Sequence, residues 1–398
     1  MKYVIILADG MADRPIEELG GKTPLEAANT PVMDYLATHG QMGMVKTVPA
    51  GMKPGSDVAN LTVFGYNPAK CYSGRSPLEA LSVGVDMKDT DVIYRCNLVT
   101  VSEEEPYEQK ILIDHSSGEI ATEDADILMD AIREAFNSDE IQFFTGTSYR
   151  HITVWNNGHE LDMEPPHDHL GVVAGPYLPG NAMFLDMMKR SFDILNDHPL
   201  NVERAKKGLN KANSIWVWGA GTKPALENFT EKTKLHGSVI SAVDLLKGIA
   251  VGAGMDVLHV PGATGSLETN YVGKAEAALK SLLEDGSDFT YIHVEAPDEM
   301  GHQGRMLDKV KSIEEVDSKV LAVIKNGLDE AGCDYRILVL PDHPTPLSIR
   351  THTSDPVPYV LYDNRNETIS TDGFSEKNAQ KTGVFEPVGH KLLDKLIG

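Results

Sequence analysis

The chain has 398 residues, of which 41% are hydrophobic and 24% charged, and this composition is typical of a soluble globular protein with room for two domains. The formal net charge of -23 argues against nucleic acid or a membrane surface as a partner, because both need a basic stripe. Three cysteines without CxxC spacing, and only a short apolar run at the start, favour a cytoplasmic protein without signal peptide or membrane span.

The first predicted element is the segment KYVIILADG, a nearly continuous apolar run at the N-terminus. Such a run is typical of a strand that is buried on both faces of a parallel sheet. The next informative segment is GMKPGSDVANLTVFGY, in which a Pro-Gly turn precedes Ser56 and a plausible helix follows it.

The middle of the chain differs in texture from both ends. DVIYRCNLVTV, QKILIDHSSGEI and YRHITVWNNGHEL have the pattern of strands separated by turns, and TEDADILMDAIREAF has the pattern of a helix. We therefore predict a smaller α+β domain at residues 88–235, inserted into a discontinuous core domain of residues 1–87 and 236–398.

The last part of the chain alternates between strand and helix. Apolar strands are predicted at DVLHVPG, FTYIHVEAPD and DYRILVLPDH, and helices such as SAVDLLKGIAVGAG and YVGKAEAALKSLLED lie between them. Together with the first strand, this alternation predicts an α/β fold with a mainly parallel sheet flanked by helices.

Acids and histidines follow three of the apolar strands. The candidates are Asp9, Asp298, His302, Asp342 and His343, with His352 in the later loop RTHTSDPVP. Ligands of open α/β sheets bind at the carboxyl ends of the strands, so we expect these side chains to converge. Carboxylates and imidazoles suit a pair of divalent ions in phosphoryl transfer, and such ions would supply the positive charge that an acidic protein needs to bind an anion.

Ser56 is the candidate nucleophile. A serine at a helix start lies among free backbone N–H groups at the positive end of the helix dipole, which suits phosphate binding. The alternative is that Ser56 is only the N-cap of its helix. Metal coordination would favour the first interpretation, because a bound cation lowers the pKa of a hydroxyl group.

The ordered motifs ADGMADRP, GKTPLEAANTP, PGSDVANLTVFGYNP, YSGRSPLEA, WVWGAG, TNYVGKAEAAL, PDEMGHQG, LPDHPTP and HTSDPVP cover nearly the whole length. Through them the chain resembles the archaeal-type, cofactor-independent (2,3-bisphosphoglycerate-independent) phosphoglycerate mutases of the alkaline phosphatase superfamily. The resemblance implies an alkaline-phosphatase-like core with an inserted lid. It also implies one metal held by Asp298, His302 and His352, and a second held by Asp9, Ser56, Asp342 and His343.

The resemblance further implies interconversion of 3-phosphoglycerate and 2-phosphoglycerate through a phosphoserine at Ser56, as a step of glycolysis and gluconeogenesis. The lid would exclude water and bind glycerate. The candidate substrate-binding residues are Arg75, Arg150, His151, His167, Asp168, Lys247 and Lys274. Arginine suits a forked contact to carboxylate or phosphate, whereas the alternatives are surface ion pairs and, for the lysines, a solvated helix face.

One departure from the family pattern concerns the substrate. The segment DVANL stands where the archaeal mutases more often have DVAHL, and we relate this change to a bacterial branch proposed to act as homoserine kinases. A homoserine-kinase-like phosphotransferase, a phosphatase and a metal-binding regulatory protein are therefore the alternative functions. Mn²⁺ is the first candidate metal, with Zn, Co or Mg also compatible, and no 2,3-bisphosphoglycerate is expected. The sequence leaves the oligomeric state and the open or closed state of the lid undetermined.

Overall fold

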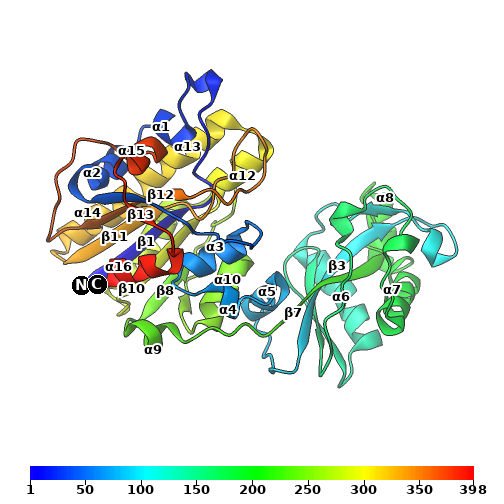
Figure 1. The fold of residues 1–398 in the computed structure, drawn as a ribbon. Helices are drawn as coiled ribbons and strands as arrows, with labels where there is room; N and C mark the ends of the chain where they lie inside the picture. Colours follow the sequence, from blue (N-terminus) through cyan, green and yellow to red (C-terminus); the bar gives the residue numbers. More distant parts are fainter. The chain divides into compact units, whose positions relative to one another are not determined.

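The computed structural model describes residues 1–398, which form two compact units (Figure 1). The core unit comprises Met1–Tyr72 and Ala225–Gly398, and the inserted unit comprises Ser73–Pro224. In neither unit does any helix combine the length and the apolar character that crossing a membrane requires.

The core unit is built on an eight-stranded sheet of order β13-β2-β12-β11-β1-β10-β8-β9. Only the two pairings of β12 are antiparallel, which confirms the predicted mainly parallel sheet. The strands are β1 (Lys2–Ala8), β2 (Gln41–Val45), β8 (Gly237–Ile240), β9 (Asp256–Val257), β10 (Phe289–Val294), β11 (Tyr335–Leu340), β12 (Val357–Asp363) and β13 (Phe385–Glu386). The strand predicted from DVLHVPG is therefore only the two residues of β9.

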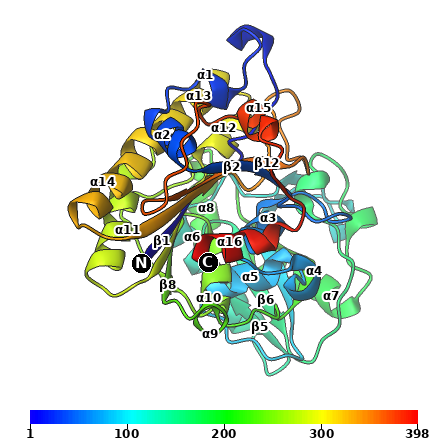
Figure 2. The same cartoon turned by 60° about the vertical axis from the view of Figure 1, so that its left-hand side comes forward.

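Helices cover both faces of this sheet (Figures 1 and 2). Val4, Ile6 and Ala8 of β1 pack in one core cluster with apolar side chains of α2, α11, α13 and α14, whereas α3, α10 and α16 lie on the other side. The helices are α1 (Pro24–Ala27), α2 (Pro31–His39), α3 (Ser56–Val63), α4 (Pro68–Cys71), α9 (Phe229–Thr233), α10 (Asp244–Gly252), α11 (Tyr271–Leu283), α12 (Ala296–Gln303), α13 (Met306–Glu315), α14 (Ala322–Glu330), α15 (Glu376–Lys381) and α16 (Leu392–Ile397). Burial on both faces explains why β1 is continuously apolar.

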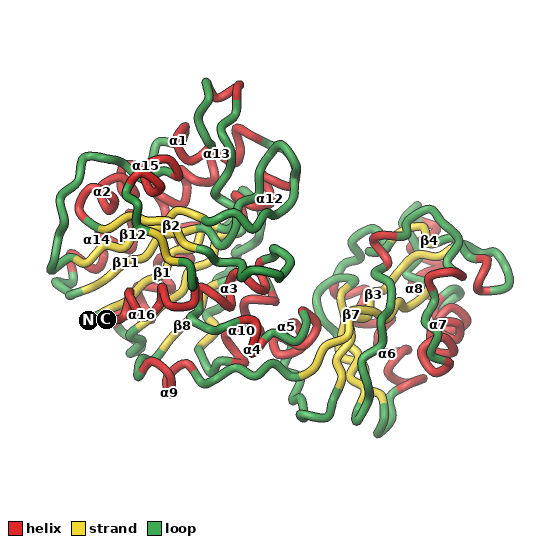
Figure 3. The backbone as a smooth tube through the Cα atoms, viewed as in Figure 1, coloured by secondary structure: helices red, strands yellow, loops and turns green.

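The inserted unit contains a five-stranded antiparallel sheet, drawn in yellow in Figure 3. Its strands are β3 (Val92–Val101), β4 (Leu112–Asp114), β5 (Ile141–Phe144), β6 (Arg150–Trp155) and β7 (Ser214–Thr222). Its helices are α5 (Arg75–Ser82), α6 (Thr122–Phe136), α7 (Ala182–Leu195) and α8 (Pro199–Lys206). Because side chains alternate along a strand, Tyr94, Cys96 and Leu98 pack in the core with α6 and α7, and Arg95 and Asn97 lie on the opposite face.

The borders between the units differ from the predicted ones. Helix α5 belongs to the inserted unit rather than to the core, because Glu79 pairs with Arg95 of β3 and Ser76 donates to the carbonyl of Gly219 in β7. Residues 225–235 belong to the core unit, where the ring of Phe229 packs on the ring of Phe289. The unit to which α5 and residues 225–235 belong is therefore decided by packing partners from other parts of the sequence.

Helix α2 receives its N-terminal cap from a distant carboxylate. Asp317 lies in a π-helical segment, Val316–Leu321, and accepts hydrogen bonds from the backbone N–H groups of Val32 and Met33 at 3.2 and 2.6 Å. Burial raises the pKa of Asp317 to about 6, although these two hydrogen bonds oppose the rise. The cap therefore keeps a proton in the folded chain at pH values where the unfolded chain has lost it.

We predict that Asp317→Asn changes the pH dependence of stability. Between about pH 4 and pH 6 the wild-type carboxyl is protonated only in the folded state, so wild-type stability falls with rising pH relative to the variant. The difference amounts to at most ~3 kcal/mol, because one pKa unit corresponds to about 1.4 kcal/mol. Thermal midpoints of both proteins from pH 4.5 to 7.5 measure it, and two parallel curves would contradict the prediction.

Candidate functional site

The carboxyl edge of the core sheet gathers the acids predicted from the strand ends. Asp9 follows β1 directly, Asp342 follows β11 after one proline, and Asp298 lies in the first turn of α12 after β10. Since β1 lies between β10 and β11 and is parallel to both, the three carboxylates meet at one edge. The strand order thus brings Asp9 close to two carboxylates from the far end of the chain.

Glycine is required where this edge is most crowded. Gly10, next to Asp9, has a φ of +60°, a conformation that L side chains rarely adopt. A Cβ atom at this position would lie 2.5 Å from Oδ1 of Asp298 and 2.6 Å from Oγ1 of Thr345. The backbone N–H of Gly10 also donates to Oδ1 of Asp342 at 3.2 Å. The turn after β1 therefore lets two of the carboxylates approach the strand end.

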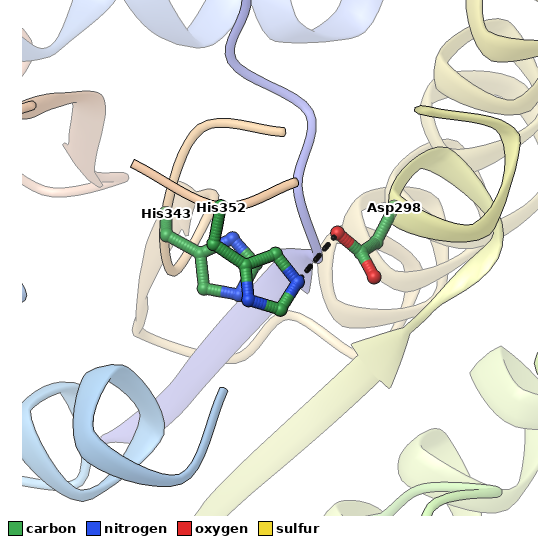
Figure 4. Close-up of side chains that lie close together, drawn as sticks. All are labelled: Asp298, His343 and His352. Atoms are coloured by element: carbon green, nitrogen blue, oxygen red, sulfur yellow. Dashed lines mark ion pairs between the residues drawn. The ribbon is translucent and has the colours of Figure 1, made fainter. Parts of the chain in front are cut away.

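The first candidate metal group consists of Asp298, His343 and His352, whose ligand atoms all lie within 4.8 Å of one another. Figure 4 shows the two imidazole rings side by side and the carboxylate of Asp298 opposite them. Nε2 of His352 lies 3.5 Å from Oδ1 of Asp298. His302, four residues after Asp298 on α12, joins them with Nε2 3.1 Å from Oδ2 of Asp298 and 2.9 Å from Nε2 of His352.

The second candidate metal group consists of Asp9, Asp342 and His343, and all three side chains are buried. Oδ1 of Asp9 has no hydrogen-bond partner although it is shielded from solvent. Burial first, and the charges of Asp342 and Asp298 next, raise the pKa of Asp9 well above its usual value. A buried carboxylate oxygen without a donor, beside two further carboxylates, fits a divalent cation, which would compensate the negative charge.

The charges of the first group are balanced differently. Burial opposes ionisation of Asp298, but hydrogen bonds from His302 and His352 outweigh it and hold the pKa of this carboxyl well below its usual value. The same hydrogen bond raises the pKa of His302 to about 9. The pairing with His302 therefore favours the ionised form of Asp298, which is the form that can bind a cation.

Ser56 lies at the start of helix α3, next to the candidate metal groups. It is the first residue of α3, and Gly55 occupies the N-cap position, so the alternative that Ser56 is only an N-cap is wrong. Its Oγ lies 3.2 Å from Nε2 of His343, the one residue that belongs to both candidate metal groups. The helix start thus presents the serine hydroxyl to the shared histidine rather than to its own backbone.

Two buried polar side chains that we did not predict contact the second group, and a third contacts one of them. His293 Nε2 lies 2.8 Å from Oδ2 of Asp9, and Nδ2 of Asn60 lies 2.9 Å from Oδ2 of Asp342. The hydroxyl of Tyr291 donates to Oδ1 of Asn60 at 2.6 Å. The signal in the sequence was the pair of polar tips two residues apart in an otherwise apolar strand, FTYIHV.

A buried ion pair between Lys309 and Asp13 is linked to the first metal group through Thr345. Thr345 donates its hydroxyl to Oδ1 of Asp298, and the backbone carbonyl of Thr345 accepts from Nζ of Lys309 at 2.8 Å. Lys309 is fully buried and pairs with Asp13 at 2.8 Å. The second aspartate of the motif ADGMADRP, Asp13, therefore has a structural partner on helix α13.

The two candidate lysines of the core unit have local partners. Lys274 is fully buried and donates to the backbone carbonyl of His293 at 3.0 Å, and burial lowers its pKa to about 8. The expectation of a solvated helix face is therefore wrong for Lys274, which stabilises the end of β10. Lys247 pairs with Asp244, one turn earlier on α10, at 3.1 Å.

In the inserted unit, the structure links three of the predicted residues through a row of rings and ion pairs. The row runs through Arg150, Tyr149, His115, His167, Trp218, Arg95, Glu79 and Arg75, each in contact with the next. We call these eight residues the cationic row. Arg95, His115 and Trp218 were missed because they come from β3, the loop after β4, and β7, which only the sheet brings together.

Two other predicted residues of the inserted unit are not members of the cationic row. His151 alternates with Arg150 on β6 and is 1% exposed on the side of the sheet that faces α6 and α7, where burial lowers its pKa to about 3. The structure therefore does not bring His151 to the cationic row. The Asp168 side chain is 63% exposed, and its carboxylate lies 3.7 Å from Nε2 of His167.

Known proteins with similar sequences share one family name. A family model described as 2,3-bisphosphoglycerate-independent phosphoglycerate mutase matches residues 37–201. A relative of that name from Methanosarcina barkeri is 48% identical over 403 residues, covering 100% of this chain and 99% of the relative. A Geobacter sulfurreducens protein, named a probable enzyme of the same kind, is 46% identical with 100% coverage of both chains.

Solved structures match over the whole length as well. A Pyrococcus horikoshii protein is 32% identical with a TM-score of 0.83, covering 100% of this chain and 96% of that one. A cofactor-independent phosphoglycerate mutase from Thermoplasma acidophilum is 27% identical with a TM-score of 0.66, covering 100% and 99%. These matches confirm the resemblance drawn from the sequence motifs, and the chain belongs to the family of 2,3-bisphosphoglycerate-independent phosphoglycerate mutases.

Proposed function

We propose that this protein interconverts 3-phosphoglycerate and 2-phosphoglycerate by transferring the phosphoryl group through Ser56, with two divalent ions and without 2,3-bisphosphoglycerate. The observation that carries the proposal is the 3.2 Å contact between Oγ of Ser56 and His343, the residue shared by two groups of metal-binding side chains. Full-length relatives at 46–48% identity that are named as such mutases support it.

In this proposal each group of side chains has a defined role. Asp298, His302 and His352 would hold one ion, and Asp9, Asp342 and His343, together with Ser56, would hold the other. Bound ions would neutralise the substrate phosphate and lower the pKa of the Ser56 hydroxyl. We take Mn²⁺ as the first candidate metal. Carboxylate and imidazole ligands accept several divalent metals, and the availability of each metal decides between them.

The reaction then consists of two transfers at Ser56. Its oxygen attacks the phosphorus atom, the bond to the 3-hydroxyl oxygen of glycerate breaks, and a phosphoserine remains. The 2-hydroxyl oxygen then attacks the same phosphorus and releases Ser56. Backbone N–H groups at the start of α3 are suited to donate to the phosphate oxygens, since Ser56 is the first residue of that helix.

We assign the inserted unit the role of a substrate-binding lid. Three arginines and two histidines of the cationic row offer donors for the carboxylate and hydroxyls of glycerate, and arginine binds a carboxylate through two parallel bonds. A lid must also exclude water, because hydrolysis of the phosphoserine would turn the mutase into a phosphatase. A cytoplasmic location follows from the proposed role in glycolysis and gluconeogenesis.

The test is a coupled assay of 3-phosphoglycerate conversion without 2,3-bisphosphoglycerate, before and after chelation and after Mn²⁺ is added back. We expect activity that chelation abolishes and Mn²⁺ restores. Release of inorganic phosphate instead of 2-phosphoglycerate would identify a phosphatase. Phosphorylation of homoserine by ATP, without mutase activity, would assign the protein to the kinase alternative and contradict our proposal.

A further inference from the structure

One face of strand β10 carries two fully buried side chains with polar tips, Tyr291 and His293, which are two residues apart. β10 pairs with β1 on one side and with β8 on the other, so the strand lies in the interior of the core sheet. Polar groups at such a position require partners, and the partners found here lead to the second metal group.

His293 contacts a candidate metal ligand directly. Its Nε2 lies 2.8 Å from Oδ2 of Asp9, and its Nδ1 lies 3.1 Å from Oγ of Ser241. Ser241 Oγ in turn accepts from the backbone N–H of Val243 at 3.0 Å. When Asp9 is ionised it can only accept, so Nε2 carries the proton and Nδ1 accepts from the serine hydroxyl. His293 thus occupies Oδ2 of Asp9 and leaves Oδ1, the oxygen without a partner, free.

Tyr291 acts through Asn60 in the same way. The tyrosine hydroxyl donates to Oδ1 of Asn60 at 2.6 Å, which fixes the orientation of the amide. The amide nitrogen then donates to Oδ2 of Asp342 at 2.9 Å and to the backbone carbonyl of Ser56 at 2.8 Å. The tyrosine ring stacks on Phe64 with centroids 4.0 Å apart, so the hydroxyl has little freedom to move. One buried amide therefore joins a candidate metal ligand to the residue that carries the nucleophile.

We propose that Tyr291 and His293 are positioning residues of the second metal group: Tyr291 orients Asp342 and Ser56 through Asn60, and His293 orients Asp9. This proposal rests on the proposed function, because it takes Asp9 and Asp342 to be metal ligands. Outer hydrogen bonds of this kind fix the orientation of a ligand, and their removal typically weakens metal binding about 10- to 100-fold.

The competing explanation is that these bonds only stabilise the fold. Tyr335 provides a matched control, since it is also a fully buried tyrosine of the same sheet, and its hydroxyl donates to Asp329 at 2.6 Å. Tyr335 lies at the start of β11, whereas Asp342 follows the end of that strand. Loss of either hydroxyl removes one hydrogen bond made by a buried tyrosine, but only Tyr291 is linked to a candidate metal ligand.

The experiment measures Mn²⁺ binding to the full chain by titration calorimetry, with Tyr291→Phe, Tyr335→Phe and the wild type compared. We expect one of the two ions to bind roughly 10-fold or more weakly in Tyr291→Phe, and both to bind normally in Tyr335→Phe. Thermal midpoints of the metal-free proteins report the structural cost of each change. Equal Mn²⁺ binding by Tyr291→Phe and the wild type would overturn the role of Tyr291, whatever the midpoints are.

Two further variants test how the positioning operates. In an Asn60→Leu background, Tyr291→Phe should weaken Mn²⁺ binding no further, because both changes interrupt the same chain of bonds. His293→Leu should weaken binding of the same ion, and His293→Gln, which keeps an N–H donor, should restore part of it. If Tyr291→Phe weakened Mn²⁺ binding by its full amount even in the Asn60→Leu background, the role of Tyr291 through Asn60 would be overturned. Equal Mn²⁺ binding by His293→Leu and the wild type would overturn the role of His293.

Failure of the proposed function gives a different result. A wild-type chain that binds two ions but does not interconvert the phosphoglycerates contradicts the reaction, while the binding data still decide the positioning roles. A wild-type chain that binds no ion contradicts both.

Discussion

Ser56→Ala is expected to lose mutase activity by roughly 10⁴-fold or more, because no other group can replace a nucleophile that carries the phosphoryl group between the two hydroxyls. The variant keeps the remaining members of both candidate metal groups, so Mn²⁺ should still bind, with some loss at the site that Ser56 would share. The coupled phosphoglycerate assay and Mn²⁺ titration measure the two effects separately. Mass spectrometry of the wild type after brief exposure to 3-phosphoglycerate should find a phosphate on the peptide that contains residue 56.

Ser375→Ala is the control for this prediction. Ser375 also lies at a helix start, where its hydroxyl accepts from the backbone N–H of Asn378 at 3.1 Å as the N-cap of α15. Its removal should cost about 1 kcal/mol of stability and leave the activity unchanged. Mutase activity near the wild-type level in Ser56→Ala would show that the phosphoryl group does not pass through this serine.

Asp13→Ala is expected to cause the largest loss of stability. Lys309 has no exposed surface and its ammonium is held by Asp13 at 2.8 Å and by the backbone carbonyl of Thr345 at 2.8 Å. Without the carboxylate, a buried charge remains uncompensated, and breaking such a pair from one side costs about 3–5 kcal/mol. Chemical denaturation measures the loss. Mn²⁺ binding should weaken too, because Thr345 also donates to Asp298 of the first metal group.

Removing both charges separates the two contributions. In Asp13→Ala combined with Lys309→Met, no buried charge is left, so we expect most of the lost stability to return. The double variant also lacks the hydrogen bond from Lys309 to the carbonyl of Thr345, so weaker Mn²⁺ binding should persist. If the double variant were as unstable as Asp13→Ala, the cause would be a packing defect at residue 13 rather than the unpaired ammonium of Lys309.

The sequence by itself determined the fold class and the chemical character of the site. Continuous apolar runs identified β1, β10 and β11 because strands buried on both faces carry mostly apolar side chains. The acids and histidines that follow these runs could be recognised because the carboxyl edge of a parallel sheet is where side chains are free to converge. The family motifs indicated the reaction, and full-length relatives confirmed the family.

The partners of each side chain were decided only by the tertiary structure. His343 belongs to both candidate metal groups because β1 lies between β10 and β11, and a strand order is not contained in the pattern of any one strand. The unit borders likewise followed from packing of α5 and α9 on distant strands rather than from local composition. The local sequence pattern predicts individual helices and strands. Which strands pair, and which helices pack on them, depends on burying the apolar side chains of the whole chain together.

The inserted unit shows the same limit for single residues. Arg150 and His151 are neighbours in the sequence, yet they lie on opposite faces of β6, one exposed beside Tyr149 and the other buried against the helices. The alternation of strand side chains predicts that the two must separate, but not which one reaches solvent. His151 is buried because α6 and α7 cover its face of the sheet, whereas the cationic row lies on the opposite face.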